Sequence, residues 1–282
     1  MKICFATVLY KEAEKFLEEF LESVAAQSYK DFDLVIINDN YDLDYLNRKL
    51  KELYRGRCVV TDCSDKKLDP PMLRVELLTA VKAAGYELAI LGDADDTFTS
   101  NRVRNVVEAF ENDSADTVYF YNMLTSSLGP DILKVIPEEV SDFKVIAQGN
   151  FLGMGNTAIR MSALSEEFID SLHAGKTTYF DWYLFTRITA EIGKGVYVPD
   201  GATIYRQHAQ NVLGDPTAKT SLEVLPELRR EQEIKLHQYE LLGQVNPWFK
   251  DLRIKLKELY IDDLYEPHDN VEGYWLNRIH ID

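Results

Sequence analysis

The chain is poor in cysteine and lacks any long run of apolar residues. Its 282 residues include three cysteines, Cys4, Cys58 and Cys63, without the paired spacing of a metal site. A sparse, odd set of cysteines is typical of a reducing compartment, so we expect a cytoplasmic protein. No apolar run reaches the ~20 residues that cross a bilayer, so we expect no membrane span. Lys11 and Glu12 follow the first apolar residues too soon for a secretory signal, which predicts a core strand there instead.

Positive charge is also scarce. Thirty-one Lys and Arg residues face 47 Asp and Glu residues, which gives a formal net charge of −16. Proteins bind nucleic acids and anionic membrane surfaces mainly by neutralising phosphates with basic side chains. We therefore expect neither as a partner. A phosphorylated small molecule would need local positive charge, which a divalent metal ion could supply.

The remaining composition, 46% hydrophobic and 28% charged, is that of an ordinary globular protein. In the first 110 residues, short apolar runs alternate with stripes at three- and four-residue spacing. The runs predict strands at 2–8, 34–37, 58–60 and 88–91, and the stripes predict helices at 13–24, 43–53, 72–84 and 103–110. This alternation predicts an α/β fold with a mainly parallel central sheet flanked by helices.

The pattern is less regular after residue 115. The expected elements are strands at 117–121, 156–161, 196–199 and 202–206, a glycine-rich loop at 148–155 and a helix at 180–192. From about residue 217, long polar helices carrying Trp248 and Trp275 predict a helical extension that packs on the rest of the chain or on a second subunit. We therefore divide the chain into a domain at 1–215 and a C-terminal helical extension at 216–282, through which a homodimer could form.

Three carboxylates follow the buried strand at 88–91. They are Asp93, Asp95 and Asp96, at the strand end where parallel α/β sheets bind ligands. Crowded carboxylates favour a cation between them, and hard oxygen ligands suit magnesium or manganese. The alternative is a solvated turn before a helix, where acidic residues are common.

Three weaker candidates also have ordinary structural explanations. Asp39 lies between two asparagines after the second strand and could bind a base or ribose, but such residues are also typical of turns. Asp181, at the start of a helix, could be a functional carboxylate or a helix cap. His208 could bind a metal or a phosphate, although a lone histidine is more commonly an ordinary surface or core residue.

In their order and spacing, these segments resemble the motifs of family 2 glycosyltransferases, which have the GT-A (nucleotide-diphospho-sugar transferase) fold. The resemblance spans about residues 2–212, and its carriers are Ala6 to Glu12, Leu21 to Tyr29, Phe32 to Asn40, Asp93 to Asp96, Phe180-Asp181 and Tyr205 to His208. They resemble, in turn, the opening Pro-x-Tyr-Asn-Glu, the first helix ending in Gln-Thr-Tyr, the strand ending in a nucleotide-binding Asp, Asp-x-Asp, Glu-Asp and Tyr-Arg-x-His. Departures at Val8, Lys11, Asn38 and Phe180 leave the nucleotide open.

The resemblance implies a glycosyltransferase that moves a sugar from a nucleotide-diphosphate sugar to an acceptor hydroxyl with inversion. Asp181 would be the catalytic base, and Asp95 with Asp93 and His208 would hold Mn²⁺ or Mg²⁺ to stabilise the leaving diphosphate. The residues expected to bind the nucleotide sugar are Thr7, Tyr10, Glu12, Asp39, Arg74 and Asp93. We expect a UDP-sugar donor and a glycan or lipid-linked saccharide acceptor, in bacterial surface polysaccharide synthesis.

Two other functions stay open. A non-catalytic nucleotide-sugar-binding subunit is disfavoured because carboxylates are present at 93, 95 and 181. A sugar nucleotidyltransferase is disfavoured because the loop after the first strand, Val8 to Glu12, has no glycine. Release of free diphosphate from a panel of nucleotide sugars would separate the three functions.

Overall fold

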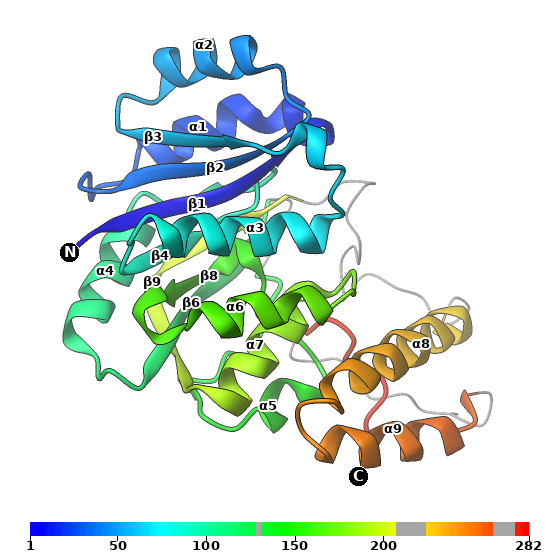
Figure 1. Ribbon diagram of the computed structural model, residues 1–282. Coiled ribbons are helices and arrows are strands. Elements are labelled where there is room, and N and C mark those ends of the chain that lie inside the picture. Colours follow the sequence, from blue (N-terminus) through cyan, green and yellow to red (C-terminus); the bar gives the residue numbers. More distant parts are fainter. Residues whose placement is uncertain (128–130, 207–223, 262–273, 282) are drawn as a thin grey trace.

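The structure is a computed structural model that describes residues 1–127, 131–206, 224–261 and 274–281 (Figure 1). Its strands are β1 (Ile3–Tyr10), β2 (Asp33–Asp39), β3 (Cys58–Asp62), β4 (Leu88–Leu91), β5 (Thr97–Phe98), β6 (Thr117–Ser126), β7 (Glu139–Val140), β8 (Thr157–Arg160) and β9 (Lys194–Tyr205). Its helices are α1 (Leu17–Ala25), α2 (Leu43–Leu53), α3 (Pro70–Ala83), α4 (Arg102–Asn112), α5 (Lys144–Ala147), α6 (Glu166–Ser171), α7 (Phe180–Glu191), α8 (Val224–Leu242) and α9 (Trp248–Glu258).

All the strands belong to one sheet with the order β3-β2-β1-β4-β8-β6-β9-β5, and β7 pairs with β9. The first half, β3-β2-β1-β4, is parallel throughout, as the alternation of strands and helices predicts. In the second half β6 and β9 are parallel, whereas β4 with β8, β8 with β6, and β9 with β5 and β7 are antiparallel. The expected mainly parallel sheet is therefore correct for the first half, and the second half is mixed.

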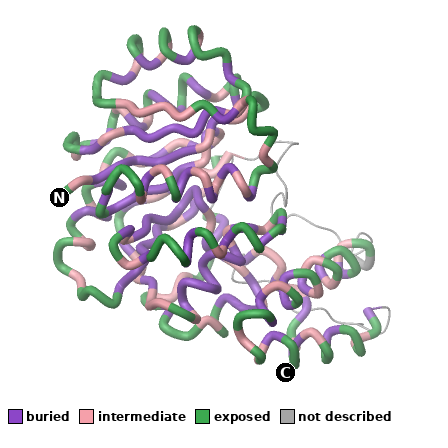
Figure 2. Tube along the Cα trace, viewed as in Figure 1, coloured by how far each residue is buried: buried purple, intermediate pink, exposed green. Residues whose placement is uncertain are grey.

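Alternating side chains along the strands build a core on each face of the sheet. In β1, Phe5 packs with residues of α1, α2 and α4, whereas Cys4 and Ala6 belong to a cluster that includes α3, α6 and α7. This follows from the two-residue period of a strand covered on both faces. Figure 1 shows α3 and α6 in front of the sheet, and Figure 2 shows that the central strands are buried along most of their length.

The predicted elements differ from the observed ones in two places. The strands expected at 196–199 and 202–206 are one strand, β9, because the pairing with β6 passes from Tyr121–Tyr197 to Met123–Ala202 across a bulge. Asp200 has a φ of 59° within this bulge, and an aspartate tolerates this conformation better than most residues. The helix expected at 13–24 begins as a 3₁₀ helix over Lys11–Phe16 and continues as α1.

The C-terminal helices α8 and α9 pack on the rest of the chain. Leu228, Tyr239 and Phe249 belong to the same buried cluster as Trp182 of α7, and the Tyr239 and Trp182 rings lie 6.2 Å apart. The expected boundary at 215 falls within residues 207–223, outside the described residues. In the described parts of the chain, no helix has both the length and the apolar character needed to span a membrane.

Candidate active site

The acidic turn lies between β4 and β5, at the carboxyl end of the parallel half. Asp96 is 2% exposed, and Asp93 and Asp95 are half-buried. Arg206, which directly follows β9, holds the turn from the other half of the sheet. Its backbone N–H donates to Asp96 Oδ1 (2.9 Å), and its Nε donates to the carbonyl of Asp95 (2.9 Å).

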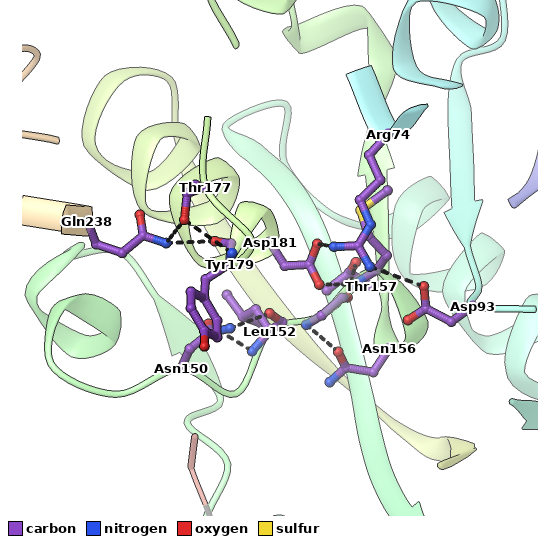
Figure 3. Close-up of polar contacts among 12 residues, drawn as sticks. Arg74, Asp93, Asn150, Leu152, Asn156, Thr157, Thr177, Tyr179, Asp181 and Gln238 are labelled. Carbon is purple, nitrogen blue, oxygen red and sulfur yellow. Dashed lines mark hydrogen bonds and ion pairs between the residues drawn. The ribbon is translucent and has the colours of Figure 1, made fainter. Parts of the chain in front are cut away.

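Arg74 of α3 joins the acidic turn to Asp181. Its Nη2 lies 3.6 Å from Asp93 Oδ1, and its Nη1 donates to Asp181 Oδ1 (Figure 3). The other carboxylate oxygen of Asp181 accepts a hydrogen bond from the backbone N–H of Met154 (3.3 Å). Asp181 is the second residue of α7. Its carboxylate is therefore the point where the start of α7, the loop that carries Met154 and helix α3 of the parallel half meet.

Glycines in the loop before β8 allow the backbone to approach these carboxylates. A Cβ atom on Gly155 would lie 2.9 Å from Asp96 Oδ2 and 3.0 Å from Asp93 Oδ2, so a larger residue would displace both. A Cβ atom on Gly153 would lie 3.7 Å from Asp181 Oδ2. The role of this glycine-rich loop is to let the backbone approach the acidic turn closely. The sequence predicts the loop but not this role.

Burial and mutual repulsion disfavour the charged forms of Asp93 and Asp96. Burial raises the pKa of Asp93 to about 7, and the charges of Asp181 and Asp95 add to this, against the opposing effects of Arg74 and a backbone hydrogen bond from Gly155. Burial, followed by the charges of Asp95 and Asp93, also raises the pKa of Asp96 well above its usual value. Carboxylates of this kind are stabilised in their charged form by an added cation.

Arg102 is a functional candidate that sequence reasoning missed. Its side chain is fully buried, and its Nη2 donates to the carbonyls of Leu91 (2.8 Å) and Thr157 (3.2 Å), which join the end of β4 to the start of β8. Its Nε and Nη1 have no hydrogen-bond partner among the described residues. Burial lowers the pKa of Arg102 to about 9, although the charges of Asp96 and Asp93 oppose this. The sequence offers one indication that Arg102 is buried, which is its position one turn before Val106 on the apolar face of α4.

Tyr10, Glu12 and Asp39 lie at the strand ends of the parallel half. Tyr10 ends β1 and pairs in register with Asp39, which ends β2. The Tyr10 hydroxyl hydrogen-bonds Asp95, and burial with the charges of Asp95 and Asp93 raises the Tyr10 pKa far above its usual value. Burial and the charge of Glu12 raise the pKa of Asp39, against a hydrogen bond from the Asn40 amide (2.7 Å). The structure therefore brings these three expected residues to the edge that carries the acidic turn.

One expected residue within the described part of the chain, Thr7, does not present its side chain to this group. Thr7 is fully buried within β1, and its hydroxyl lies 3.5 Å from the carbonyl of Val8. His208 lies outside the described residues. Asn38, which precedes Asp39, is buried and serves the fold, because its amide donates to the Tyr41 carbonyl and to Asp62.

Comparison with known families identifies the chain. The sequence model described as Glycosyl transferase family 2 matches residues 4–166, more than half of the chain. The chain belongs to glycosyl transferase family 2. A search of curated proteins gave no match.

Solved glycosyltransferases show the fold that this family 2 chain adopts. The S. aureus protein TarS, residues 1–349, solved with UDP-GlcNAc, is 13% identical with a TM-score of 0.55 over 94% of this chain and 75% of that one. The same protein with UDP gives 14% and 0.55 over 97% and 95%. GalNAc-T7, solved with UDP, GalNAc and Mn²⁺, gives 14% and 0.54 over 94% of this chain and 52% of that one. These likenesses confirm the GT-A fold.

The acidic turn of this glycosyltransferase fits an oxygen-seeking divalent metal in its donor types. Oxygens of Asp93 and Asp96 converge on Gly155, and both carboxylates carry raised pKa values. Within the described residues, no group of three or more His, Cys, Asp or Glu side chains is arranged to hold a metal ion. The expected third ligand, His208, is not among those residues, so the ligand set at Asp93, Asp95 and His208 stays a prediction.

Proposed function

We propose that this family 2 glycosyltransferase transfers a sugar from a nucleotide-diphosphate sugar, with a UDP-sugar as the first choice, to an acceptor hydroxyl. The single observation that carries the proposal is the contact of Arg74 with both Asp93 and Asp181. This contact supports the proposal because it joins Asp181, the proposed base, to the acidic turn at the strand edge where α/β sheets bind ligands. UDP in the solved structures of TarS and GalNAc-T7 supports the choice of donor.

The strand ends of β1 and β2 form the proposed nucleotide side. Asp39 and Glu12 would bind the base and ribose through hydrogen bonds, and Tyr10 would close this edge against Asp95. Arg74 would contact the diphosphate, since a guanidinium offers paired donors to phosphate oxygens. Thr7 would contribute by shaping β1, because its side chain is buried.

The acidic turn would hold Mn²⁺ or Mg²⁺ through Asp95 and Asp93, with His208 as a third ligand. The bound ion would supply the positive charge that stabilises the departing diphosphate. Arg74 contacts the Asp93 carboxylate, and Arg206 donates to the Asp96 carboxylate and to the backbone carbonyl of Asp95. These residues would keep the carboxylates oriented for the ion.

Asp181 is the proposed general base. The Arg74 Nη1 and the Met154 N–H each engage one of its oxygens, and a carboxylate has about four acceptor sites. Asp181 therefore retains acceptor capacity for the proton of an attacking hydroxyl. Attack from the face opposite the leaving diphosphate would invert the anomeric configuration. The two hydrogen bonds would hold the carboxylate in one orientation while it accepts the proton.

The direct test is diphosphate release from a panel of nucleotide sugars in the presence of Mn²⁺ or Mg²⁺. We expect turnover above the buffer background with at least one UDP-sugar. Tight binding of UDP without turnover on any acceptor would instead support the non-catalytic subunit. Formation of a nucleotide sugar and pyrophosphate from a nucleoside triphosphate and a sugar phosphate would support the nucleotidyltransferase.

Four further points belong to the same proposal. The acceptor would be a glycan or lipid-linked saccharide of bacterial surface polysaccharide synthesis. The protein would act in the cytoplasm. The division of the chain at 215/216 and a homodimer through the C-terminal helices also stay predictions. Measurement of the molecular mass of the full chain in solution would test the homodimer.

A further inference from the structure

Helix α8 of the C-terminal extension reaches the segment that starts α7. Gln238 of α8 is fully buried, and its Nε2 donates to the Thr177 hydroxyl and to the Tyr179 carbonyl, both at 2.9 Å (Figure 3). The Tyr179 N–H also donates to the Thr177 hydroxyl (3.1 Å). Nearby, a ring nitrogen of His237 lies 3.0 Å from the Lys176 carbonyl. One turn of α8 therefore holds residues 176–179 by side-chain contacts with the backbone and with one hydroxyl.

These contacts matter because α7 lacks an ordinary N-terminal cap. The cap residue, Tyr179, makes no side-chain cap hydrogen bond in the described structure, and its φ of −98° and ψ of 51° lie outside the helical and extended regions. Asp181 is only two residues further along. The backbone conformation that aims Asp181 is thus held by an amide from another element rather than by a local cap.

The residue after Gln238 strengthens the same junction. Tyr239 is fully buried, and its ring lies 6.2 Å from that of Trp182, the residue after Asp181. Its hydroxyl donates to the Ala147 carbonyl (3.1 Å) at the end of α5. Gln238 therefore contacts the segment that precedes Asp181 in sequence, and Tyr239 contacts the residue that follows it.

We infer that Gln238 is a positioning residue for the reaction, acting on Asp181 through Thr177 and Tyr179. The inference rests on the proposed role of Asp181 as the base. It makes the C-terminal extension part of the machinery that orients the base toward the acceptor. A catalytic group must be held close to its productive geometry, and a misplacement of about 1 Å can cost about 100-fold in rate.

A second glutamine of α8 provides a matched control. Gln232 donates through its Nε2 to two carbonyls, those of Leu256 (2.8 Å) and Leu259 (2.9 Å), and so ties α8 to the α9 end of the extension. The Gln238→Met and Gln232→Met variants each lose two amide hydrogen bonds from the same helix. Only the first loses them at the start of α7.

The experiment measures amide hydrogen exchange in residues 177–183 of the full chain, together with turnover of the active UDP-sugar and UDP affinity. For Gln238→Met we expect faster exchange in this segment, a roughly 10- to 100-fold loss of kcat and unchanged UDP affinity. For Gln232→Met we expect wild-type exchange in this segment and wild-type kcat. In an Asp181→Asn background, Gln238→Met should bring no further loss, because both changes act on one group.

Three outcomes overturn the inference. One is wild-type exchange at 177–183 in Gln238→Met, and a second is faster exchange with wild-type kcat. The third is an equal further loss of kcat in the Asp181→Asn background, which indicates a general structural effect. If Asp181→Asn alone keeps wild-type turnover, the proposed base is wrong and the inference falls with it. Faster exchange in Gln238→Met would then show that the Gln238 hydrogen bonds do hold the start of α7, and that only the assignment of Asp181 as the base is wrong.

Discussion

The two halves of the sheet supply the site in different ways. The parallel half contributes residues at strand ends: Tyr10 is the last residue of β1, Asp39 is the last residue of β2, and Asp93 lies two residues after β4. The mixed half contributes groups held by contacts between distant segments, such as Asp181 at the start of α7 and Arg206 after β9. The first half places its groups by topology, and the second places them by long-range hydrogen bonds.

This difference predicts a division of labour. Substitutions at the strand ends of the parallel half should change nucleotide or metal affinity. Substitutions in the mixed half and the extension should change turnover or stability while nucleotide affinity is kept. Arg74 crosses the division, because it belongs to α3 and contacts carboxylates from both halves. The predictions below test the division, from the largest expected effect to the smallest.

The largest effect is expected at Asp181. In Asp181→Asn, turnover should fall about 10²- to 10⁴-fold while UDP affinity and the melting temperature stay close to wild type, because asparagine keeps the size but cannot accept the proton. Kinetics with the active UDP-sugar and calorimetric UDP binding measure the two quantities. The control is Asp170→Asn, at an exposed aspartate of α6, which should behave as wild type. Near-normal kcat in folded Asp181→Asn would remove this residue from the mechanism.

The next effect concerns a buried ion pair in the extension that holds the C-terminal segment, which itself pairs with Asn150 in the mixed half. Lys235 of α8 is fully buried, lies 3.0 Å from Glu231 and donates to the Ile279 carbonyl. Glu231 in turn accepts from the backbone N–H groups of Arg278 (3.0 Å) and Ile279 (2.9 Å). Lys235→Met leaves the Glu231 carboxylate buried without its ion partner, which should lower the free energy of unfolding by about 3–5 kcal/mol.

Chemical denaturation measures this loss. The matched control is Lys257→Met, at an exposed lysine of α9, which should change stability by less than about 0.5 kcal/mol. Equal stability of the two variants would show that the buried pair does not hold the C-terminal segment. The proposal that substitutions in the extension change stability while nucleotide affinity is kept would then lose this support.

Sequence reasoning succeeded where local pattern decides position. Sequence reasoning predicts the parallel half from four strand–helix alternations, and in a parallel sheet the residues at the strand ends, here Tyr10, Asp39 and Asp93, lie at one edge. It could not place Asp181 beside Asp93, since their link runs through Arg74, 107 positions from Asp181. The bulge that joins two predicted strands into β9 depends on pairing with β6, and no local pattern reveals it.

Burial of charge was also beyond the sequence. Arg102 lies on the apolar face of α4, and its role becomes visible only when its hydrogen bonds to Leu91 and Thr157 are known. Gly155 resembles any loop glycine until two carboxylate oxygens are found beside it. Both cases depend on tertiary contacts between elements that lie far apart in the chain.

A smaller effect is expected for metal-dependent binding at the parallel half. Asp95→Ala should remove the increase in UDP affinity that Mn²⁺ produces, a loss of about 10-fold or more, while the protein stays folded. Titration of UDP with and without Mn²⁺ measures the increase. Asp44→Ala, at an exposed aspartate of α2, is the control. A Mn²⁺-dependent increase that survives in Asp95→Ala would contradict the proposed role of this residue.

The smallest effect on turnover and nucleotide binding is expected for the last prediction, the pH dependence of stability at Asp93. Burial raises its pKa in the folded protein to about 7, above the value of about 4 in an unfolded chain. The folded state therefore binds the proton more tightly, and the contribution of Asp93 to stability, fully present below about pH 4, is lost as the pH rises through 7. Asparagine does not ionise, so in EDTA the Asp93→Asn variant should melt above the wild type by a few degrees at about pH 8. This difference should shrink at about pH 5.

Added Mn²⁺ at pH 8 should reverse the order of the two melting temperatures, because the ionised carboxylate of the wild type then has a cation beside it. A difference in melting temperature that is constant with pH would show that the pKa of Asp93 is not raised, and Asp96 would then be the carboxylate of the acidic turn whose charged form is disfavoured by burial.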